Sequence, residues 1–246
     1  MSSCVPCINR WLGRRRDENL IPAGSRQALD GNKPNGGFAD MILKELDPFH
    51  GGDERAFAAR ISADRLAYYL RRYYRRSAEV DVINGLRIRS AGSMTRIDHL
   101  LLHSHGMLVI EREDVNGQVE IDDDGQWTAL SNGRMVSLGS PITRAYVQAL
   151  LLKALLDRRV RQKGFFDNLE LDVLVVVSDE CEIRWPQTGR LVEVCSREAV
   201  HDRVSSRLEQ CRAAARQPGP LTAVERRTLG WFLTSAHWPG SDMELH

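Results

Sequence analysis

The stretch RIDHLLLHSHGMLVIERE, residues 96–113, decides the fold because it holds two apolar runs that carry acidic residues. In a β-strand, residues two apart in the sequence lie on the same face. Glu111 and Glu113 therefore share a face with the apolar Val109. An unpaired charge on a core-side strand face is costly, so such carboxylates are normally paired, bound to a metal or placed at the edge of a cleft.

Asp98 lies in the preceding run, followed closely by three leucines, and is equally out of place for an apolar strand. If the two runs form neighbouring strands, Asp98 and Glu111 converge on one cation. Mg²⁺ favours one or two protein carboxylates, and such an ion stabilises the charge that develops as a phosphodiester breaks. The alternative is that both carboxylates lie in solvent or pair with arginines. His99 and His103 alternate with Asp98 and are expected to pack or hydrogen-bond on the opposite face.

Upstream of this stretch, residues 53–76 are predicted to form an amphipathic helix, because apolar side chains recur at steps of mostly three to five residues. These side chains are Phe57, Ile61, Leu66, Leu70 and Tyr73. Residues 1–52 are expected to form a flexible N-terminal arm, since Gly, Asn and Pro crowd residues 29–37. Within it, FADMILKEL (residues 38–46) has helical spacing and predicts a short helix.

From Glu79 onward the pattern changes to strands separated by turn residues. The dipeptide Asn116–Gly117, flanked by strand-like residues, is a strong hairpin signal. We therefore predict a meander of four to six strands, joined largely by antiparallel hairpins.

A long helix is predicted to run from Pro141 to about Arg161, with Ser140 as its N-cap. LELDVLVVVS, residues 169–178, is a nearly continuous apolar run, as expected for a strand buried on both faces. The remaining predicted elements are a strand at 190–196 and helices near 197–216 and 221–235.

The composition is that of an ordinary globular protein, with 42% hydrophobic and 27% charged residues among 246 and a net charge of +1. No run approaches the roughly 18 apolar residues of a membrane span, and the first residues lack the charge order of a secretory signal. Five scattered cysteines do not form a disulfide framework. A cytoplasmic location is therefore expected.

The N-terminal arm carries one C-x-x-C pair, Cys4 and Cys7, but a zinc site needs two further ligands at suitable spacing. A lipid-modified or membrane-touching start is the alternative for these cysteines. The arm is otherwise expected to be a loosely ordered leader that serves as a docking attachment for a protein partner.

Basic residues concentrate on the predicted first helix, around two tyrosines. They are Arg71, Arg72, Arg75 and Arg76. Guanidinium groups beside aromatic rings suit contacts with nucleic-acid phosphates. A second cluster, residues 158–163, ends the long helix, where the helix dipole favours cations anyway. For each cluster, a solvated face with local ion pairs is the alternative.

Residues 96–130, followed by SPITRAYVQALLLKALL at 140–156, resemble the nuclease-related domain (NERD) family of the PD-(D/E)xK nucleases. The resemblance rests on Ile-Asp-His, a Gly that starts a strand ending in Glu, a second Gly beyond it, a Trp after an acidic turn, and Ser-Pro opening a helix that carries Gln. It implies an α/β (α+β) restriction-endonuclease-like core, a mixed sheet with antiparallel hairpins flanked by helices. This core would occupy residues 53–180, with residues 181–246 completing or extending it.

By position, the resemblance implies that Asp98 and Glu111 bind Mg²⁺ or Mn²⁺. It also implies a further acidic ligand on the first helix near Asp64, where the match to the family's Gly-x-x-Glu is loose. Gln148 lies on the helix whose N-terminal part faces the site in related nucleases. The substrate would be DNA or another nucleic acid.

Two departures from the family surround this site. The family's strand ends Glu-x-Lys, and Glu113 stands at the lysine position. The lysine is thought to position the attacking water, so Glu113 reverses the charge at that point. Arg144 stands where the family tends to have Gln, and it either restores a positive charge in the cleft or forms a salt bridge with Glu113 that plugs the site.

Three hypotheses follow from these residues. The first is a metal-dependent nucleic-acid hydrolase with a degenerate active site, in which Asp98, Glu111, Glu113 and Gln148 take part in catalysis. The second is a catalytically inactive module of the same fold that binds nucleic acid, with Arg144 among the contacts. The third is a protein-interaction role for the N-terminal arm or the C-terminal helices.

Overall fold

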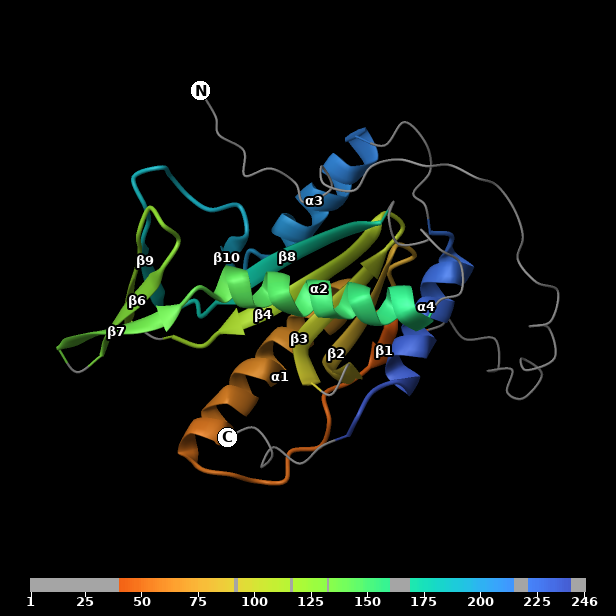
Figure 1. The fold of residues 1–246 in the computed structure, drawn as a ribbon, viewed down its shortest axis with the longest axis horizontal. Helices are drawn as coiled ribbons and strands as arrows, with labels where there is room; N and C mark the ends of the chain where they lie inside the picture. Colours follow the sequence, from red (N-terminus) through yellow and green to blue (C-terminus); the bar gives the residue numbers. More distant parts are fainter. Residues whose placement is uncertain are drawn as a thin grey trace. The chain divides into compact units, whose positions relative to one another are not determined.

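The computed structural model describes residues 40–90, 93–115, 117–131, 133–159, 169–214 and 221–239, which belong to a unit that begins at Asp40. Figure 1 labels their helices and strands. In chain order these are β1 (Ile42–Lys44), α1 (Glu54–Tyr74), β2 (Val80–Ser90), β3 (Ser93–His103), β4 (Gly106–Glu113), β5 (Gly117–Ile121), β6 (Trp127–Ser131), β7 (Arg134–Gly139), α2 (Pro141–Arg159), β8 (Glu170–Val177), β9 (Cys181–Arg184), β10 (Val194–Ser196), α3 (Val200–Ala214) and α4 (Ala223–Ser235).

The strands form two sheets. The larger has six strands in the order β1-β2-β3-β4-β8-β10, and the smaller has four in the order β7-β6-β5-β9. In the larger sheet β2, β3 and β4 are antiparallel to one another, whereas β1, β8 and β10 run parallel to their neighbours. The predicted fold class, a mixed sheet with antiparallel hairpins flanked by helices, is therefore confirmed.

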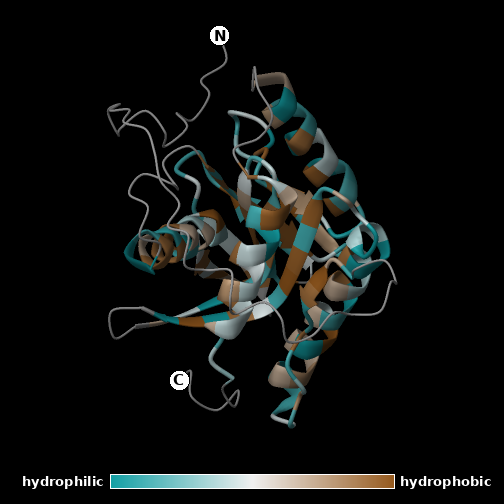
Figure 2. Cartoon of the chain, turned by 90° about the vertical axis from the view of Figure 1, so that its right-hand side faces the viewer, coloured by the Kyte–Doolittle hydropathy of each residue, from teal (hydrophilic) through white to brown (hydrophobic). Residues whose placement is uncertain are grey.

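Helices cover both faces of the larger sheet, as alternation along its strands requires. On one face, Met107 and Val109 belong to the apolar cluster that includes α2 and α4. On the other, Leu108 and Ile110 belong to the cluster that includes α1 and α3. Apolar residues concentrate in the central strands, whereas the helices alternate between apolar and polar residues (Figure 2). The predicted alternation along residues 107–113 is thus confirmed.

Local sequence chemistry starts the helices where it was expected to. Asp53 caps α1 by accepting a hydrogen bond from the N–H of Ala56. The Oγ atom of Ser140 accepts one from the N–H of Thr143 at the start of α2. These caps satisfy backbone donors that have no partner inside the helix. Among the described residues, no helix combines the length and the hydropathy that crossing a membrane demands.

The short helix expected at residues 38–46 is wrong for the described part of that segment. Residues Ile42–Lys44 form β1, which pairs in parallel with β2, and the N–H of Val82 donates to the carbonyl of Met41 at 2.8 Å. The edge of a sheet offers unpaired backbone groups, and this pairing overrides the weak helical spacing. The first strand of the sheet therefore lies before residue 53, where we expected the domain to begin.

The hairpin expected at Asn116–Gly117 is also wrong. Strand β4 pairs with β3 and β8, while β5 pairs with β6 and β9 in the other sheet. The edge of β4 is taken by β8, which is buried and aligns with it from Gly106 to Glu113. The contact is close at Gly106, where a Cβ atom would lie 2.0 Å from the carbonyl oxygen of Glu170. The chain after β4 consequently leaves for the second sheet.

The apolar stripe predicted for the first helix is correct only in its C-terminal half. Leu66 and Leu70 are buried, but Phe57 and Ile61 are 57% and 39% exposed. Burial on α1 begins at Ala63, so the first two turns add no buried apolar side chain to the core. Helical periodicity indicates which side of a helix is apolar, but not how far along its length the neighbouring sheet extends.

Candidate active site

Two neighbouring strands bring Asp98 and Glu111 to adjacent positions. The β3–β4 register pairs His99 with Ile110, and one further step along both strands sets Asp98 against Glu111. The backbone N–H of Arg112 donates a 3.1 Å hydrogen bond to Oδ2 of Asp98. The side chain of Asp98 therefore binds β4 directly beside Glu111.

Two guanidinium groups neutralise Asp98. The Nε atoms of Arg96 and Arg112 each lie 3.5 Å from one of its carboxylate oxygens. Burial raises the pKa of Asp98, but the charges of Arg112 and Arg96 outweigh burial and hold that pKa below its usual value. Arg112 is itself fixed, because Nη1 donates to the carbonyl of Ala59 at 2.9 Å and to Asp114 at 2.8 Å. Asp98 is thus a charged carboxylate with partners inside the protein.

Helix α2 supplies two side chains that bind Glu111. Arg144 and Gln148 are four residues apart, so both lie on the same face of α2. Nε of Arg144 lies 3.2 Å from Oε1 of Glu111, and Nε2 of Gln148 donates to Oε2 at 2.8 Å. Burial and the charge of Asp98 raise the pKa of Glu111, while the hydrogen bonds from Gln148 and Arg144 oppose this rise.

Arg144 also binds Glu113, so that one guanidinium group joins both glutamates of β4. Its Nη2 atom contacts Oε2 of Glu113, and its Nη1 atom donates to the carbonyl of Leu138 at 3.1 Å. Burial raises the pKa of Glu113 despite the hydrogen bond from Arg144. Of the two arrangements considered for Arg144 from the sequence, the structure has the salt bridge with Glu113.

Each carboxylate at this site has a guanidinium partner within the protein. Four carboxylates, those of Asp98, Glu111, Glu113 and Asp114, face the three guanidinium groups of Arg96, Arg112 and Arg144. Within the described ranges, no group of three or more His, Cys, Asp or Glu side chains is placed to hold a metal ion. The donor chemistry suits Mg²⁺ or Mn²⁺, but Arg144 occupies oxygens that such an ion would need. As arranged, the site does not fit the metal that the resemblance implies.

The other predicted metal ligand, Asp64, is not brought into this group. It lies on α1, where its carboxylate accepts hydrogen bonds from Nε of Arg60 at 2.9 and 3.0 Å. The buried residues of α1 pack against the apolar cluster opposite α2, whereas Glu111 binds two side chains of α2. The metal-binding role of Asp64 remains a prediction.

The predicted histidine positions agree with the structure. The Nδ1 atom of His99 lies 2.8 Å from Oδ1 of Asn84, and neither His99 nor His103 contacts Asp98 by a hydrogen bond in the described part of the chain. Leu101, between the two histidines, packs in the cluster that includes α1 and α3. Burial lowers the pKa of His99 and of His103 to about 3. Both imidazoles are neutral near pH 7.

The predicted basic cluster on α1 splits into two kinds of arginine. Arg71 forms an ion pair with Glu45, and Arg75 lies 3.2 Å from Asp40. Arg72 and Arg76 are exposed and make no ion pair with the residues that the structure describes. In the second cluster, Arg161 and Lys163 lie outside the described residues, as do Cys4 and Cys7.

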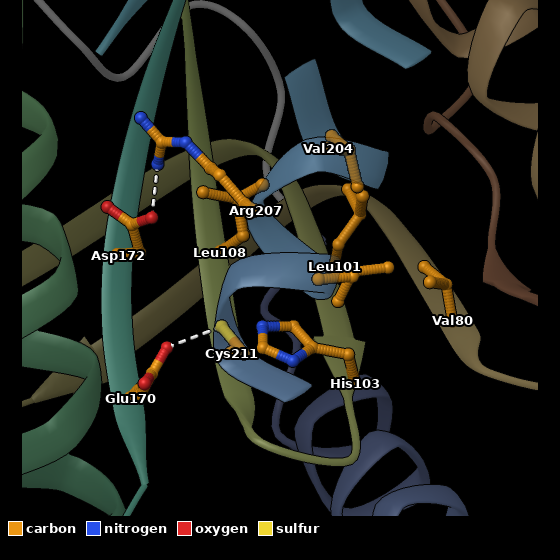
Figure 3. A pocket seen from close by; sticks show the side chains of 10 residues that line it. Val80, Leu101, His103, Leu108, Glu170, Asp172, Val204, Arg207 and Cys211 are labelled. Atoms are coloured by element: carbon orange, nitrogen blue, oxygen red, sulfur yellow. Dashed lines mark hydrogen bonds and ion pairs between the residues drawn. The ribbon is translucent and has the colours of Figure 1, made fainter. Parts of the chain in front are cut away.

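A hollow away from the carboxylates is lined by β3, β4, β8 and α3 and contains a cysteine (Figure 3). The Sγ atom of Cys211 donates to Oε2 of Glu170 at 2.7 Å, and Arg207 pairs with Asp172. Burial and the hydrogen bond to Glu170 raise the pKa of Cys211 to about 12. Because the thiolate is the nucleophilic form, Cys211 is not an activated nucleophile.

Comparison with known families locates this site within a matched region. The family model described as "Nuclease-related domain" matches residues 58–178. The chain contains a nuclease-related domain. The matched range includes β3, β4 and α2, and hence all the carboxylates and arginines described above. No curated protein and no solved structure matches the chain. The predicted family is therefore confirmed.

Arg96 and Arg112 were not singled out from the sequence. Arg96 lies two residues before Asp98, which places both side chains on one strand face. Arg112 alternates with Glu111, so periodicity assigns it to the opposite face, and it contacts Asp98 beyond the last β3–β4 residue pair, His99 with Ile110. The sequence spacing therefore indicated the contact of Arg96 with Asp98, but not that of Arg112.

Proposed function

We propose that this nuclease-related domain binds nucleic acid and does not hydrolyse it while Arg144 bridges Glu111 and Glu113. The bridge is the observation that carries the proposal. A hydrolytic centre of this type needs carboxylate oxygens that are free to bind a divalent cation. Here the carboxylate oxygens of Glu111 and Glu113 on β4 accept hydrogen bonds from Arg144 and Gln148 instead.

The two departures from the family pattern support the same conclusion. Glu113 stands where the family has lysine, and Arg144 stands where the family tends to have glutamine. Glu113 without Arg144 would be a carboxylate without its ion-pair partner in a partly buried site, whereas together the two residues form an ion pair. The pair of substitutions therefore exchanges a cation-binding site for an internal salt bridge.

Nucleic-acid binding is supported by exposed arginines in the last turn of α1 and just after it. Arg72 and Arg76 are exposed and carry no ion pair within the described residues, so their charges are available to phosphates. The net charge of the chain is only +1, which means that any attraction must come from such a local cluster.

Cleavage assays with restored family residues test the proposal. The wild type, Glu113→Lys, Arg144→Gln and the double variant are incubated with linear duplex DNA, single-stranded DNA and RNA in Mg²⁺ or Mn²⁺. The wild type is expected to cut none of them, and the double variant is expected to gain metal-dependent cleavage. Adding Asp98→Ala to the double variant should remove the gained activity, which excludes a contaminating nuclease. Cleavage by the wild type that Asp98→Ala abolishes would refute the proposal.

A second candidate function is metal-dependent hydrolysis after Arg144 moves away. It is favoured by the adjacent carboxylates of Asp98 and Glu111 and by Gln148, whose buried Oε1 atom has no hydrogen-bond partner in the described part of the chain. This candidate predicts that Arg144→Gln alone activates cleavage, because the Oε1 atom of Glu111 then loses its guanidinium partner and becomes available to a cation. No activity in that variant, together with activity in the double variant, would favour the first proposal.

A docking role for residues 1–52 also stays a proposal. Residues 1–39 lie outside the described residues. A pull-down that compares the full chain with a variant lacking residues 1–39 tests whether these residues bind a protein partner.

A further inference from the structure

Helix α1 and the turn after it carry an exposed stripe of arginine and tyrosine, formed by Arg65, Tyr68 and Arg72 on the helix and Arg76 in the turn. Steps of three and four residues place Arg65, Tyr68 and Arg72 on one face of the helix. Tyr68 is 61% exposed, and all three arginines are exposed. Because α1 packs on the cluster opposite α2, the stripe is separate from the carboxylates that bind Arg144.

The stripe differs from the rest of the helix in its free charge. Arg71 and Arg75 are bound by Glu45 and Asp40, and Arg60 is bound by Asp64. In contrast, the three arginines of the stripe form no ion pair or hydrogen bond with any described residue. Their guanidinium groups are therefore available to bind a ligand, and a row of positive charges suits a polyanion.

A hollow of about 560 Å³ lies beside Tyr68. Its lining residues are Ile61, Asp64, Arg65, Tyr68, Tyr69 and Arg197. Asp64 is the acidic member, and its carboxylate is already paired with Arg60. Arg197 is almost fully buried and lies 3.4 Å from Asp179. The hollow therefore has an aromatic wall, an aliphatic residue and guanidinium groups, and its volume falls in the range of ligand-binding pockets.

The ring of Tyr68 contacts one other aromatic ring, which belongs to a row of rings that reaches α3. The ring of Tyr69 meets Tyr68 edge-on at 6.0 Å, and Tyr69 stacks with Tyr73 at 6.4 Å. Tyr73 in turn stacks on His201 of α3 at 4.2 Å. An exposed ring that is supported in this way loses little conformational entropy when a ligand stacks on it.

We propose that this stripe binds single-stranded nucleic acid, with one base stacked on Tyr68 at the hollow and phosphates bound by Arg65 and Arg72. Arg65 and Arg72 are seven residues apart, about 10 Å along the helix, so they flank Tyr68 on both sides. An unpaired base has a free ring face, whereas the bases of a duplex are already stacked on one another. The inference rests on the proposed nucleic-acid binding and adds the strandedness of the ligand and the place where it binds.

Fluorescence anisotropy with a labelled oligothymidine and a labelled duplex of equal length tests this. The full chain is compared with Tyr68→Ala, Tyr68→Phe and Arg72→Gln. Trp231→Ala is the matched control, because Trp231 is 53% exposed on α4, which packs on the other face of the sheet. Tyr68→Ala is expected to weaken oligothymidine binding about 5- to 150-fold, while Tyr68→Phe keeps the ring and the affinity. Arg72→Gln is expected to lower the salt slope by about 0.7.

The outcomes separate this inference from the function on which it rests. If Tyr68→Ala binds oligothymidine as tightly as Trp231→Ala and the wild type do, the inference is overturned. The proposed nucleic-acid binding would still stand. Tighter binding of the duplex than of oligothymidine also overturns it. Absence of binding to either ligand at low salt refutes the proposed function together with the inference. Loss in Tyr68→Ala but not in Tyr68→Phe, with Trp231→Ala at wild-type affinity, supports stacking at this position.

Discussion

Replacing Arg144 by glutamine removes the guanidinium group that joins Glu111 to Glu113. The two carboxylates are 11% and 13% exposed, so they cannot regain full hydration when their partner is lost. Hydrogen bonds to charged groups contribute about 1.5–3 kcal/mol each, but Arg144 is 43% exposed and water replaces part of each bond. We therefore expect a loss of about 1–3 kcal/mol in the free energy of unfolding at pH 7. For a unit of this size that corresponds to a fall in Tm of about 2–12 °C.

The loss should depend on pH, and its direction follows from the carboxylates. Burial already raises the pKa of Glu111 and Glu113 above the ordinary value of 4.5, and removing Arg144 raises both further. A carboxyl group with a raised folded-state pKa costs stability as pH rises from its unfolded pKa through its folded pKa. The difference between wild type and Arg144→Gln should therefore be small near pH 4 and largest above pH 7.

Urea unfolding of both proteins between pH 4 and 8 measures this difference. Arg72→Gln is the matched control, because Arg72 is exposed and has no ion pair among the described residues, and it should change stability little at any pH. Adding Glu113→Gln to Arg144→Gln should recover part of the loss, since a neutral amide needs no guanidinium partner. A loss that is the same at pH 4 and pH 8, or that Glu113→Gln does not reduce, would refute this account of the site.

Three further predictions concern residues of the larger sheet and of α4 outside the carboxylate site. Gly106→Ala should destabilise the protein by about 3 kcal/mol or more or prevent folding, because its Cβ atom would meet the carbonyl oxygen of Glu170 at 2.0 Å; urea midpoints or soluble yield measure this. Arg226→Leu should cost about 1.5–3 kcal/mol because the fully buried Asp81 loses its hydrogen bond to Arg226 and keeps only the 3.2 Å ion pair with Arg227, and a second change, Asp81→Asn, should recover part of that loss in the same assay. His103, with a pKa of about 3, should show no titration of its imidazole NMR signals between pH 5 and 8, and a midpoint near 6.5 would contradict its burial.

Much of the local structure could be read from the sequence because it depends on near neighbours. Helix α2 begins at Pro141, after the Ser140 cap, as expected, and β8 covers the apolar run at residues 170–177. Alternation along β4 correctly assigned Glu111 to the face of Val109. The family motif also identified Asp98 and Glu111 as neighbours before their register was known.

The strand at residues 42–44 and the path of the chain after β4 both depend on pairing partners far away in the sequence. Ile42–Lys44 became a strand because the edge of β2, some 40 residues later, accepted it. Strand β4 pairs with β8, more than 60 residues away, and that pairing excluded the hairpin that Asn116–Gly117 indicated. Backbone groups of a strand pair with whichever edge is free in three dimensions, which a local turn signal does not record.

The sequence by itself determined which residue types meet at the candidate site: an acidic residue on each of two strands, a glutamate in place of lysine, and an arginine on the helix that follows. The tertiary structure decided what they do together, because the register of β3 on β4 and the placement of α2 over them bring Arg144 to both glutamates. The reach of one side chain depends on the distance between a helix and a sheet, and that distance is set by the packing of Ala145 and Ala149 against the strands. Sequence spacing carries no record of it.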